Sequence, residues 1–470
     1  MLFSSYEFIF LFLPISFLVY FYLNKKKLTT ASKSWLITSS LFFYSWWNIS
    51  YLPLILGSII VNYLLTARMI RLTGDQPFFS KKITFISGLI FNIALLSYFK
   101  YMDFFIENTN IVLGTDTPAL HLALPLAISF FTLQQIAFLI DSYEGLVKEK
   151  NILDYTIFVT FFPQLIAGPI VHHKEMMPQF KRIRNKVKHR CNISLGLFIF
   201  SIGLFKKVVI ADTFAIWANA GFDSSATLNF IDAWSASLSY TFQLYFDFSG
   251  YTDMAIGAAL LFNIHLPQNF NSPYKATGMI DFWKRWHITL TNFITTYIYT
   301  PIIRSFSPLT FHKAMLGTLI TFLIAGLWHG ASWMFIIFGG LHGLGIVINQ
   351  YWKKRKIKLH KVVAWLITFN FINVTFVFFR AENWEGAMHV LNGMISIHSI
   401  QTPDNIQVFI YPIIAFALLL LTKNTHQLMG QFKASKKIGY LTFACFALSL
   451  LQLNNLMISS NHSEFLYFNF

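Results

Sequence analysis

Long apolar runs alternate with short polar or basic segments along the whole chain. A helix needs about 20 apolar residues to cross a bilayer, and within lipid it satisfies its own backbone hydrogen bonds. The pattern therefore predicts an all-α polytopic membrane protein with roughly a dozen transmembrane helices. We expect the apolar spans at residues 1–23, 35–47, 52–65, 83–99, 122–140, 193–211, 233–261, 315–327, 333–347, 362–379, 408–421 and 440–457.

Composition agrees with this pattern and excludes a soluble domain. The 470 residues are 55% hydrophobic and only 12% charged, with a mean hydropathy of +0.54. A soluble domain carries roughly 25% charged residues. The net charge of +16 comes from basic clusters between the apolar runs, which are typical of cytoplasmic loops. Nucleic-acid binding needs a basic, aromatic face in water, so we expect no nucleic-acid partner.

The basic clusters also predict the orientation of the chain. The first span is followed, not preceded, by Lys25, Lys26 and Lys27, so we interpret it as a retained span with its N-terminus outside. Lys148 and Lys150 precede another apolar run and are assigned to the inside. Two cysteines are too few for a disulfide framework or a thiolate metal site. We expect outside loops at residues 101–118, 219–229 and 381–405, and inside loops at 353–356 and 423–437.

The apolar segment 155–171 interrupts the alternation, because basic residues flank it on both sides. Pro163 and the pair Gly168–Pro169 break any helix there. A re-entrant segment fits these features, since irregular backbone is tolerated at membrane depth only when protein buries it. We expect Gln164 to line a substrate path; a simple turn would explain the prolines but not the apolar character.

Two pairs of charged residues fall deep within apolar spans. The span at 193–211 carries Lys206 and Lys207, and we expect their stems to snorkel to the far headgroups. Asp247 and Asp253 lie within the span at 233–261. Being six positions apart, they do not share a helix face and do not form a carboxylate dyad. They are assigned to a polar substrate tunnel, but helix pairing through hydrogen bonds is the stronger interpretation.

The segment 325–332 places His329 between two apolar runs. An ionisable side chain at membrane depth indicates function, and imidazole suits a general base that deprotonates an acceptor hydroxyl. Trp328 would wall the pocket. The alternative is a histidine that packs and hydrogen-bonds across helices. The arms of this helical hairpin, at 315–327 and 333–347, are shorter than a full span, which would hold His329 inside the protein.

His287 is the second candidate. On a helix, Trp283 and His287 would share one face and Lys284 another. Lys284 and Arg285 are candidates for contacts with donor phosphates, but an interfacial amphipathic helix explains the segment equally well. Four further side chains close the candidate list. Trp286 and His342 are assigned to the tunnel. The vicinal pair His172–His173 lacks ligand partners at metal spacing, so we expect no metal.

Taken in order, the motifs resemble the membrane-bound O-acyltransferase (MBOAT) family, and within it the bacterial alginate O-acetylation branch (AlgI type). The resemblance spans nearly the whole chain. It rests on the segments 125–132, 162–170, 245–257, 269–274, 282–290, 327–332 and 465–470.

This resemblance implies a single domain over 1–470: N-terminal spans in 1–150, a core in 151–350 and C-terminal spans in 351–470. It implies an MBOAT-type ring of helices with re-entrant segments around a central tunnel, in a bacterial inner membrane. It implies that acyl transfer depends on His329, that His287 is the second recurrent polar position, and that no cofactor is resident. The donor would be acetyl-CoA or an acyl-carrier thioester. Periplasmic acetyltransferase partner proteins would complete transfer to a polysaccharide such as alginate.

Three functions remain open at this point. The first is a membrane O-acetyltransferase, with D-alanyl or peptidoglycan acyl transfer as variants within the same family. The second is a transporter or flippase without chemistry, although no internal sequence repeat of the kind found in many carriers is evident. The third is a scaffold for periplasmic enzymes.

Overall fold

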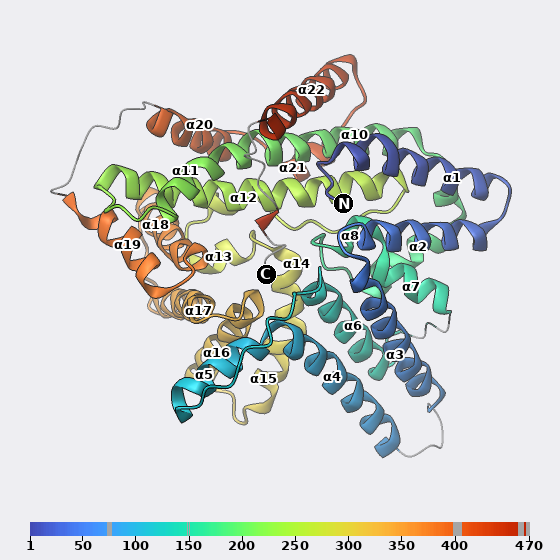
Figure 1. The fold of residues 1–470 in the computed structure, drawn as a ribbon, viewed down its shortest axis with the longest axis horizontal. Coiled ribbons are helices and arrows are strands. Elements are labelled where there is room, and N and C mark those ends of the chain that lie inside the picture. The colour runs from blue at the N-terminus through green and yellow to red at the C-terminus, as the bar shows by residue number, and fades with distance from the viewer. Residues whose placement is uncertain (73–77, 148, 150, 398–406, 459–464, 467–470) are drawn as a thin grey trace.

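The computed structural model describes residues 1–72, 78–147, 149, 151–397, 407–458 and 465–466, and the regular elements in these residues are helices (Figure 1). Each predicted apolar span is helical. The long helices are α1 (Leu13–Lys25), α2 (Thr29–Ser45), α3 (Leu52–Arg71), α4 (Phe78–Lys100), α6 (Ile128–Tyr143), α10 (Arg190–Phe205), α11 (Asp212–Phe222), α12 (Phe230–Leu261), α16 (Phe311–His329), α17 (Trp333–Lys354), α18 (Lys361–Arg380), α20 (Gln407–Leu421) and α22 (Lys436–Ile458).

Within the described ranges, eight helical stretches are long and apolar enough to cross a membrane. The first of them, Glu7–Lys25, contains α1. Another, Arg190–Phe222, is continuous because the π-helical turn η4 (Lys206–Ala211) joins α10 and α11. The helices α2, α6, α12 and α20 correspond to the remaining predicted spans. The chain is therefore an all-α, multi-pass membrane protein.

The longest helix, α12, runs through the middle of the molecule with α10 alongside it (Figure 1). Glycines permit this close approach. A Cβ atom at Gly203 would lie 2.6 Å from the Gly250 carbonyl oxygen, and one at Gly196 would lie 2.7 Å from that of Gly257. Small residues allow membrane helices to pack at this distance. Any larger side chain at these four positions would push the two helices apart.

The lysines beside this crossing do not snorkel, which corrects the sequence expectation. Lys206 Nζ lies 2.7 Å from Asp253 Oδ2, and Lys207 Nζ lies 2.7 Å from Asp247 Oδ1 and 2.8 Å from Asp212 Oδ1. Buried carboxylates are nearer than any headgroup, so the ammonium groups turn inward.

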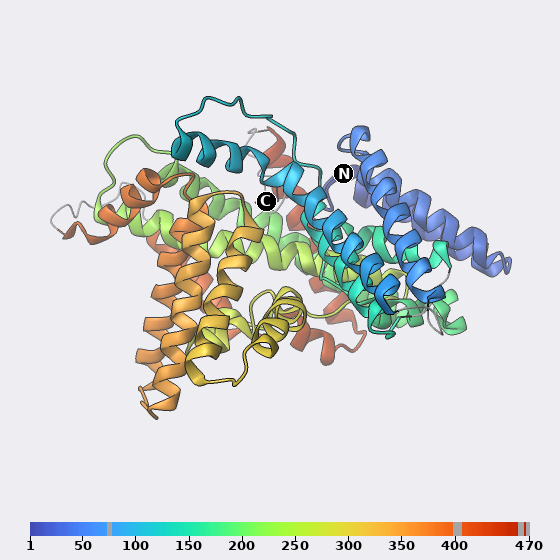
Figure 2. The ribbon, with the colours of Figure 1, turned by 90° about the horizontal axis from the view of Figure 1, so that it is seen from below.

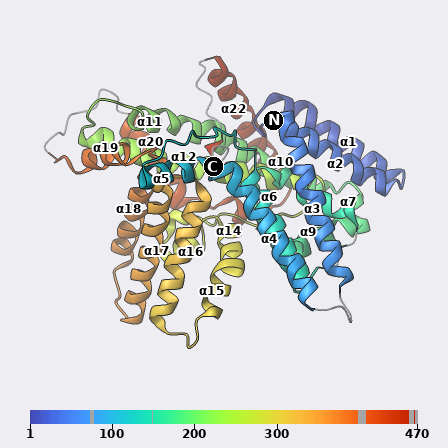
Figure 3. The ribbon, with the colours of Figure 1, turned by 60° about the horizontal axis from the view of Figure 1, so that its bottom comes forward.

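Two groups of helices flank α12. One contains α3, α4 and α6, and the other contains α16, α17 and α18; both run crosswise to α12 (Figures 2 and 3). The short elements α13 (Met279–Trp283), α14 (Ile288–Ile294), η6 (Thr295–Tyr299) and α15 (Thr300–Ser305) lie between these groups. The chain ends approach the centre as well, because the rings of Phe3 and Phe465 both stack on Tyr251, at 4.7 and 4.2 Å.

Several predicted loops contain helices. The expected outside loop 101–118 forms α5 (Met102–Leu113), the segment 381–405 contains α19 (Trp384–Ile395), and the inside loop 423–437 contains α21 (Thr425–Gly430). The predicted span at 122–140 begins only at Ile128, after a turn in which Ala127 has φ +60°. The helices α19 and α21 pack on the protein through buried residues, whereas α5 has none. Lys148, Lys150 and residues 398–405 and 467–470 lie outside the described residues.

Candidate active site

The predicted hairpin is formed by α16 and α17, with the turn Gly330–Ser332 between them. Its arms are 19 and 22 residues long, so the expectation of short arms is wrong. Polar His312 and Lys313, which precede the predicted arm, lie within regular helix and extend it beyond its apolar core. Gly326 and Gly339 bring the two arms together, because a Cβ at Gly326 would lie 2.9 Å from the Gly339 Cα. His329 is therefore held at the end of a rigid helix pair.

His329 is the last residue of α16 and is buried. Three aromatic rings surround its imidazole, with centroids 5.0 Å away in Trp328, 5.9 Å in Phe338 and 5.2 Å in Phe379. Trp328 also packs against Phe130, at 5.5 Å. These rings exclude water from most of the imidazole and fix its orientation, as a positioned general base requires.

Lys100 holds the end of this helix and was not singled out from the sequence. At the C-terminus of α4, its Nζ donates to the carbonyl oxygens of Trp328 and His329, at 2.5 and 3.1 Å, and to Ser129 Oγ at 3.0 Å. The neighbouring Tyr101 hydroxyl donates to the Leu327 carbonyl at 2.9 Å. The last carbonyls of a helix have no partner within it, and a cation there also complements the helix dipole. The feature of the sequence that could have indicated Lys100 is its position directly after the apolar span 83–99.

A cavity of about 440 Å³ runs along one face of α16 and ends at His329. Thr318, Thr321, Ala325 and His329 line it at helical spacing, so they share that face. The opposite wall comes from α14 and η6. Lys284 and Gln350 line the cavity too, which directs it toward the basic end of the hairpin.

A second cavity, of about 310 Å³, lies beyond the hairpin turn. Gly330, Ala331 and Ser332 line it together with Lys100 and Asp103, near the start of the segment predicted to lie outside. His329 and its immediate successors therefore face two separate hollows. One extends toward the predicted cytoplasmic end of the hairpin and the other opens at its predicted outer end.

His287 is not on a helix face shared with Trp283, which corrects the sequence expectation. Helix α13 ends at Trp283, and His287 precedes α14 with φ +44°. This left-handed conformation is uncommon for residues other than glycine. The imidazole is fully buried, and Phe248 contacts it edge-on at 4.7 Å. His287 and His329 both pack against Trp328, since the His287 and Trp328 ring centroids are 6.5 Å apart.

Asn269 determines which nitrogen of His287 carries the proton. Its Oδ1 accepts from the Thr289 backbone N–H at 3.2 Å and from the Thr289 hydroxyl at 2.9 Å, so this atom is the amide oxygen. His287 Nδ1, 3.1 Å away, must therefore donate to it. The lone pair is then on Nε2. Asn269 belongs to a motif that the family resemblance included, but its contact with His287 links residues that no local pattern connects.

The re-entrant prediction fits the broken path of α7 (Ile152–Thr160) and α8 (Phe162–Leu165), which is buried throughout residues 157–171. The Ile170 backbone N–H donates to Thr289 Oγ1 at 3.1 Å, which attaches this segment to the His287 motif. Gln164 Nε2 donates to the Phe158 carbonyl at 2.7 Å, so it supports the fold of its own segment.

The other predicted tunnel residues lie away from the two cavities. Asp247 and Asp253 are held in the ion pairs of the α10–α12 crossing. His342 receives a hydrogen bond from Trp283 Nε1 at 3.1 Å and its Nε2 lies 2.9 Å from Thr375 Oγ1. Trp286 packs among aromatic rings.

The two residues predicted to contact the donor, Lys284 and Arg285, lie in different surroundings. Lys284 lines the cavity that ends at His329, whereas Arg285 pairs with Asp281 at 2.8 Å. Of the vicinal histidines, His172 Nδ1 lies 3.0 Å from the Tyr297 hydroxyl. Its neighbour His173 belongs to a different network.

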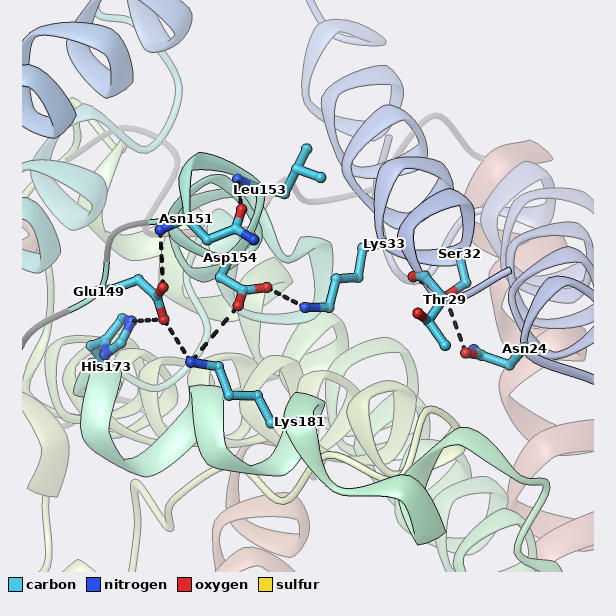
Figure 4. Close-up of polar contacts among 10 residues, drawn as sticks. All are labelled: Asn24, Thr29, Ser32, Lys33, Glu149, Asn151, Leu153, Asp154, His173 and Lys181. Atoms are coloured by element: carbon cyan, nitrogen blue, oxygen red, sulfur yellow. Dashed lines mark hydrogen bonds and ion pairs between the residues drawn. The ribbon is translucent and has the colours of Figure 1, made fainter. Parts of the chain in front are cut away.

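That network is an ion-pair cluster outside the membrane-spanning helices (Figure 4). Lys181, on α9 (His173–Lys181), lies 2.8 Å from Glu149 and 3.8 Å from Asp154 of α7, and Lys33 of α2 also pairs with Asp154. Burial would raise the pKa of Glu149, but hydrogen bonds from Lys181 and Asn151 outweigh it and the pKa is lowered. Burial lowers the pKa of His173 to about 4. The cluster joins α2, α7 and α9.

The sequence model of the membrane-bound O-acyltransferase family matches residues 17–381. The chain belongs to the MBOAT family. It is similar to a peptidoglycan O-acetyltransferase of Helicobacter pylori, at 45% identity over 100% of this chain and 98% of that protein. It is also similar to a probable alginate O-acetylase AlgI of Pseudomonas aeruginosa, at 35% identity over 86% and 76% of the two chains. A teichoic acid D-alanyltransferase of Bacillus subtilis is 25% identical over 55% and 69%.

As an MBOAT protein the chain is a membrane acyltransferase, which confirms the family and the enzyme class expected from its motifs. The geometry adds how such a site is arranged here. A buried imidazole stands where two cavities approach each other, and a lysine from a distant helix fixes the backbone that carries it.

Proposed function

We propose that this chain transfers an acetyl group from a cytoplasmic thioester to an acceptor hydroxyl on the outer side of the membrane, in a relay that leads to O-acetylation of a glycan. The observation that carries this proposal is the position of His329. Its side chain lines the cavity that runs toward Lys284 and the basic end of the hairpin, and the residues directly after it line the cavity at the opposite end. A donor and an acceptor approaching from the two sides would meet at this residue.

In this proposal His329 acts as the general base. It takes the proton from an acceptor hydroxyl as the hydroxyl oxygen attacks the thioester carbonyl carbon. The new C–O bond forms, the C–S bond breaks, and the thiolate leaves and takes up the proton, so the ester and the free thiol are the products. A positioned base of this kind contributes about 10²–10⁴-fold to the rate. The aromatic rings around His329 keep bulk water from competing as acceptor.

The donor would be acetyl-CoA or an acetylated carrier, bound as a substrate and not as a resident cofactor. Both end in a phosphate-bearing pantetheine thiol, a narrow and flexible group that suits an elongated cavity. Lys284 lines the wall of that cavity and is suited to bind a phosphate. Arg285 is less suited, because Asp281 already occupies its guanidinium group.

For the acceptor we favour peptidoglycan over alginate. The support is similarity: the relative named for peptidoglycan is 45% identical over the full chain, whereas the relative named for alginate is 35% identical over 86% of it. Either polymer is too large for the outer cavity of about 310 Å³. A periplasmic acetyltransferase partner that relays the acetyl group to the sugar is therefore part of this proposal, as is an inner-membrane location.

The test replaces His329 with Gln in a bacterium whose own peptidoglycan O-acetyltransferase has been deleted. Acetate released by mild base from purified peptidoglycan should fall to the deletion background, at unchanged membrane abundance of the protein. His312→Gln, at the opposite and exposed end of the same helix, is the matched control and should retain acetylation. Normal acetylation by His329→Gln would refute the catalytic role. Acetate found only on exopolysaccharide would refute the choice of acceptor.

A further inference from the structure

A third cavity lies beside the proposed donor path but does not reach His329. Its volume is about 600 Å³, and it is bounded by α13, the last turns of α17 and the first turns of α18. One part of its lining is apolar and lipid-facing. Ile348 and Ile367, each about half exposed, flank it on the outer surfaces of α17 and α18, where the hydrocarbon of a bilayer would contact them.

The other part of the lining is cationic. Lys284, Lys353 and Lys361 border the cavity, and its one acidic lining residue, Asp281, is paired with Arg285. The connection 353–361 between α17 and α18 carries six Lys and Arg residues and no acid. These six side chains are exposed, and none of them forms an ion pair with a residue that the structure describes.

We propose that this cavity binds an anionic glycerophospholipid of the cytoplasmic leaflet. The acyl chains would lie on Ile348, Ile367 and Phe371, and the phosphate would lie against Lys353 and Lys361. Trp352, which also lines the cavity, is a residue type that favours the level of the lipid headgroups. Basic pockets between membrane helices on the cytoplasmic side recognise acidic headgroups in this manner.

The combination of surfaces favours a lipid over the acyl donor. A donor must bring its thioester to His329, which lines the neighbouring cavity and is absent from this one. A lipid needs a lateral opening between apolar helix surfaces with a positive rim at one end, and this cavity has both. The bound lipid would fill the space behind Ile280 and Lys284, the two residues that both cavities share, and would support the wall of the donor path.

The experiment is native mass spectrometry of the full-length protein, equilibrated with equimolar phosphatidylglycerol and phosphatidylcholine of identical acyl chains. We expect wild type to retain more phosphatidylglycerol, by about ten-fold. The double variant Lys353→Gln/Lys361→Gln should bring the ratio close to one. The matched control Arg182→Gln/Arg184→Gln removes two exposed arginines that line none of the cavities described here, and should leave the ratio unchanged.

Three outcomes would overturn the proposal. Equal retention of both lipids by wild type would show that the cavity does not select charge. An equal loss of selectivity in both double variants would indicate nonspecific attraction to the basic surface. Displacement of phosphatidylglycerol by added coenzyme A would assign the cavity to the donor. Because the readout is lipid binding, its failure is independent of whether His329→Gln abolishes acetyl transfer.

Discussion

Two buried polar regions of this protein are built in opposite ways. At the α10–α12 crossing, Lys206 and Lys207 are paired with carboxylates at 2.7–2.8 Å. At the end of the hairpin, the His329 imidazole lies among three aromatic rings, and the charged side chain nearest its backbone, Lys100, bonds to carbonyl oxygens. In the first region, two lysines are paired with three carboxylates. In the proposed reaction, the second contains a group that changes charge.

This difference separates structural from chemical roles. A fully paired buried charge resists change, because removing one partner leaves the other without compensation. A base that accepts a proton during turnover needs surroundings that hold it in place, as the three rings around His329 do. We therefore assign Asp247 and Asp253 to the scaffold and His329 to chemistry. The predictions below test this assignment.

The largest effect is expected for Lys207→Met. This variant leaves Asp212 and Asp247 buried near each other without their shared cation, and breaking a buried pair costs about 3–5 kcal/mol. We expect little folded protein in membranes and a strongly lowered Tm for what is recovered in detergent. Lys206→Met should be milder, because Asp253 keeps its 2.6 Å hydrogen bond from Thr425. A Lys207→Met protein as stable as wild type would contradict the scaffold assignment.

The next effect is expected for Lys100→Met, which tests whether the helix end positions His329. The substitution keeps the length of the side chain but removes hydrogen bonds to the Trp328 and His329 carbonyls, each worth about 1.5–3 kcal/mol when the donor is charged. Local relaxation should offset part of this loss. We expect about ten-fold slower acetyl transfer with the protein still folded.

Tyr101→Phe is the matched control for Lys100→Met. It removes one neutral hydrogen bond, to the Leu327 carbonyl. The hydrogen bonds from Lys100 to the Trp328 and His329 carbonyls remain. Its transfer rate should stay within about two-fold of wild type, since a neutral hydrogen bond contributes about 1 kcal/mol or less here. Equal rates for wild type and Lys100→Met would exclude Lys100 as a positioning residue.

The contrast between these regions also marks how far sequence reasoning reaches. The apolar pattern predicted the helices, and the 325–332 motif located His329 at the turn of its hairpin. The relation of His287 to Trp283 was wrong, because i,i+4 spacing presumes a continuous helix and the chain turns with φ +44° at His287. Local periodicity carries no information about such a break.

Partners distant in the chain were also beyond a local pattern. Lys100 and Trp328 are 228 positions apart, and their contact depends on where α4 meets α16. For Lys206 and Lys207 the general rule of snorkelling failed, because the choice between a headgroup and a carboxylate depends on which helix lies alongside. The buried aspartates were visible in the sequence; their pairing with these lysines needed the fold.

The smallest effect concerns the cluster outside the spans, where pH acts on stability through His173 (Figure 4). Burial against Phe138 and Phe158 lowers its pKa to about 4, from an unfolded value near 6.5. The unfolded chain therefore binds the proton first, and stability present above pH 6.5 is lost as the pH falls toward 4. Between pH 7 and 5.5 the loss from this residue should be about 1 kcal/mol.

His173→Phe should flatten the dependence of Tm on pH over this range, whereas His426→Phe, at an exposed histidine, should not. The same slope in His173→Phe and wild type would mean that the histidine is not held neutral in the folded protein.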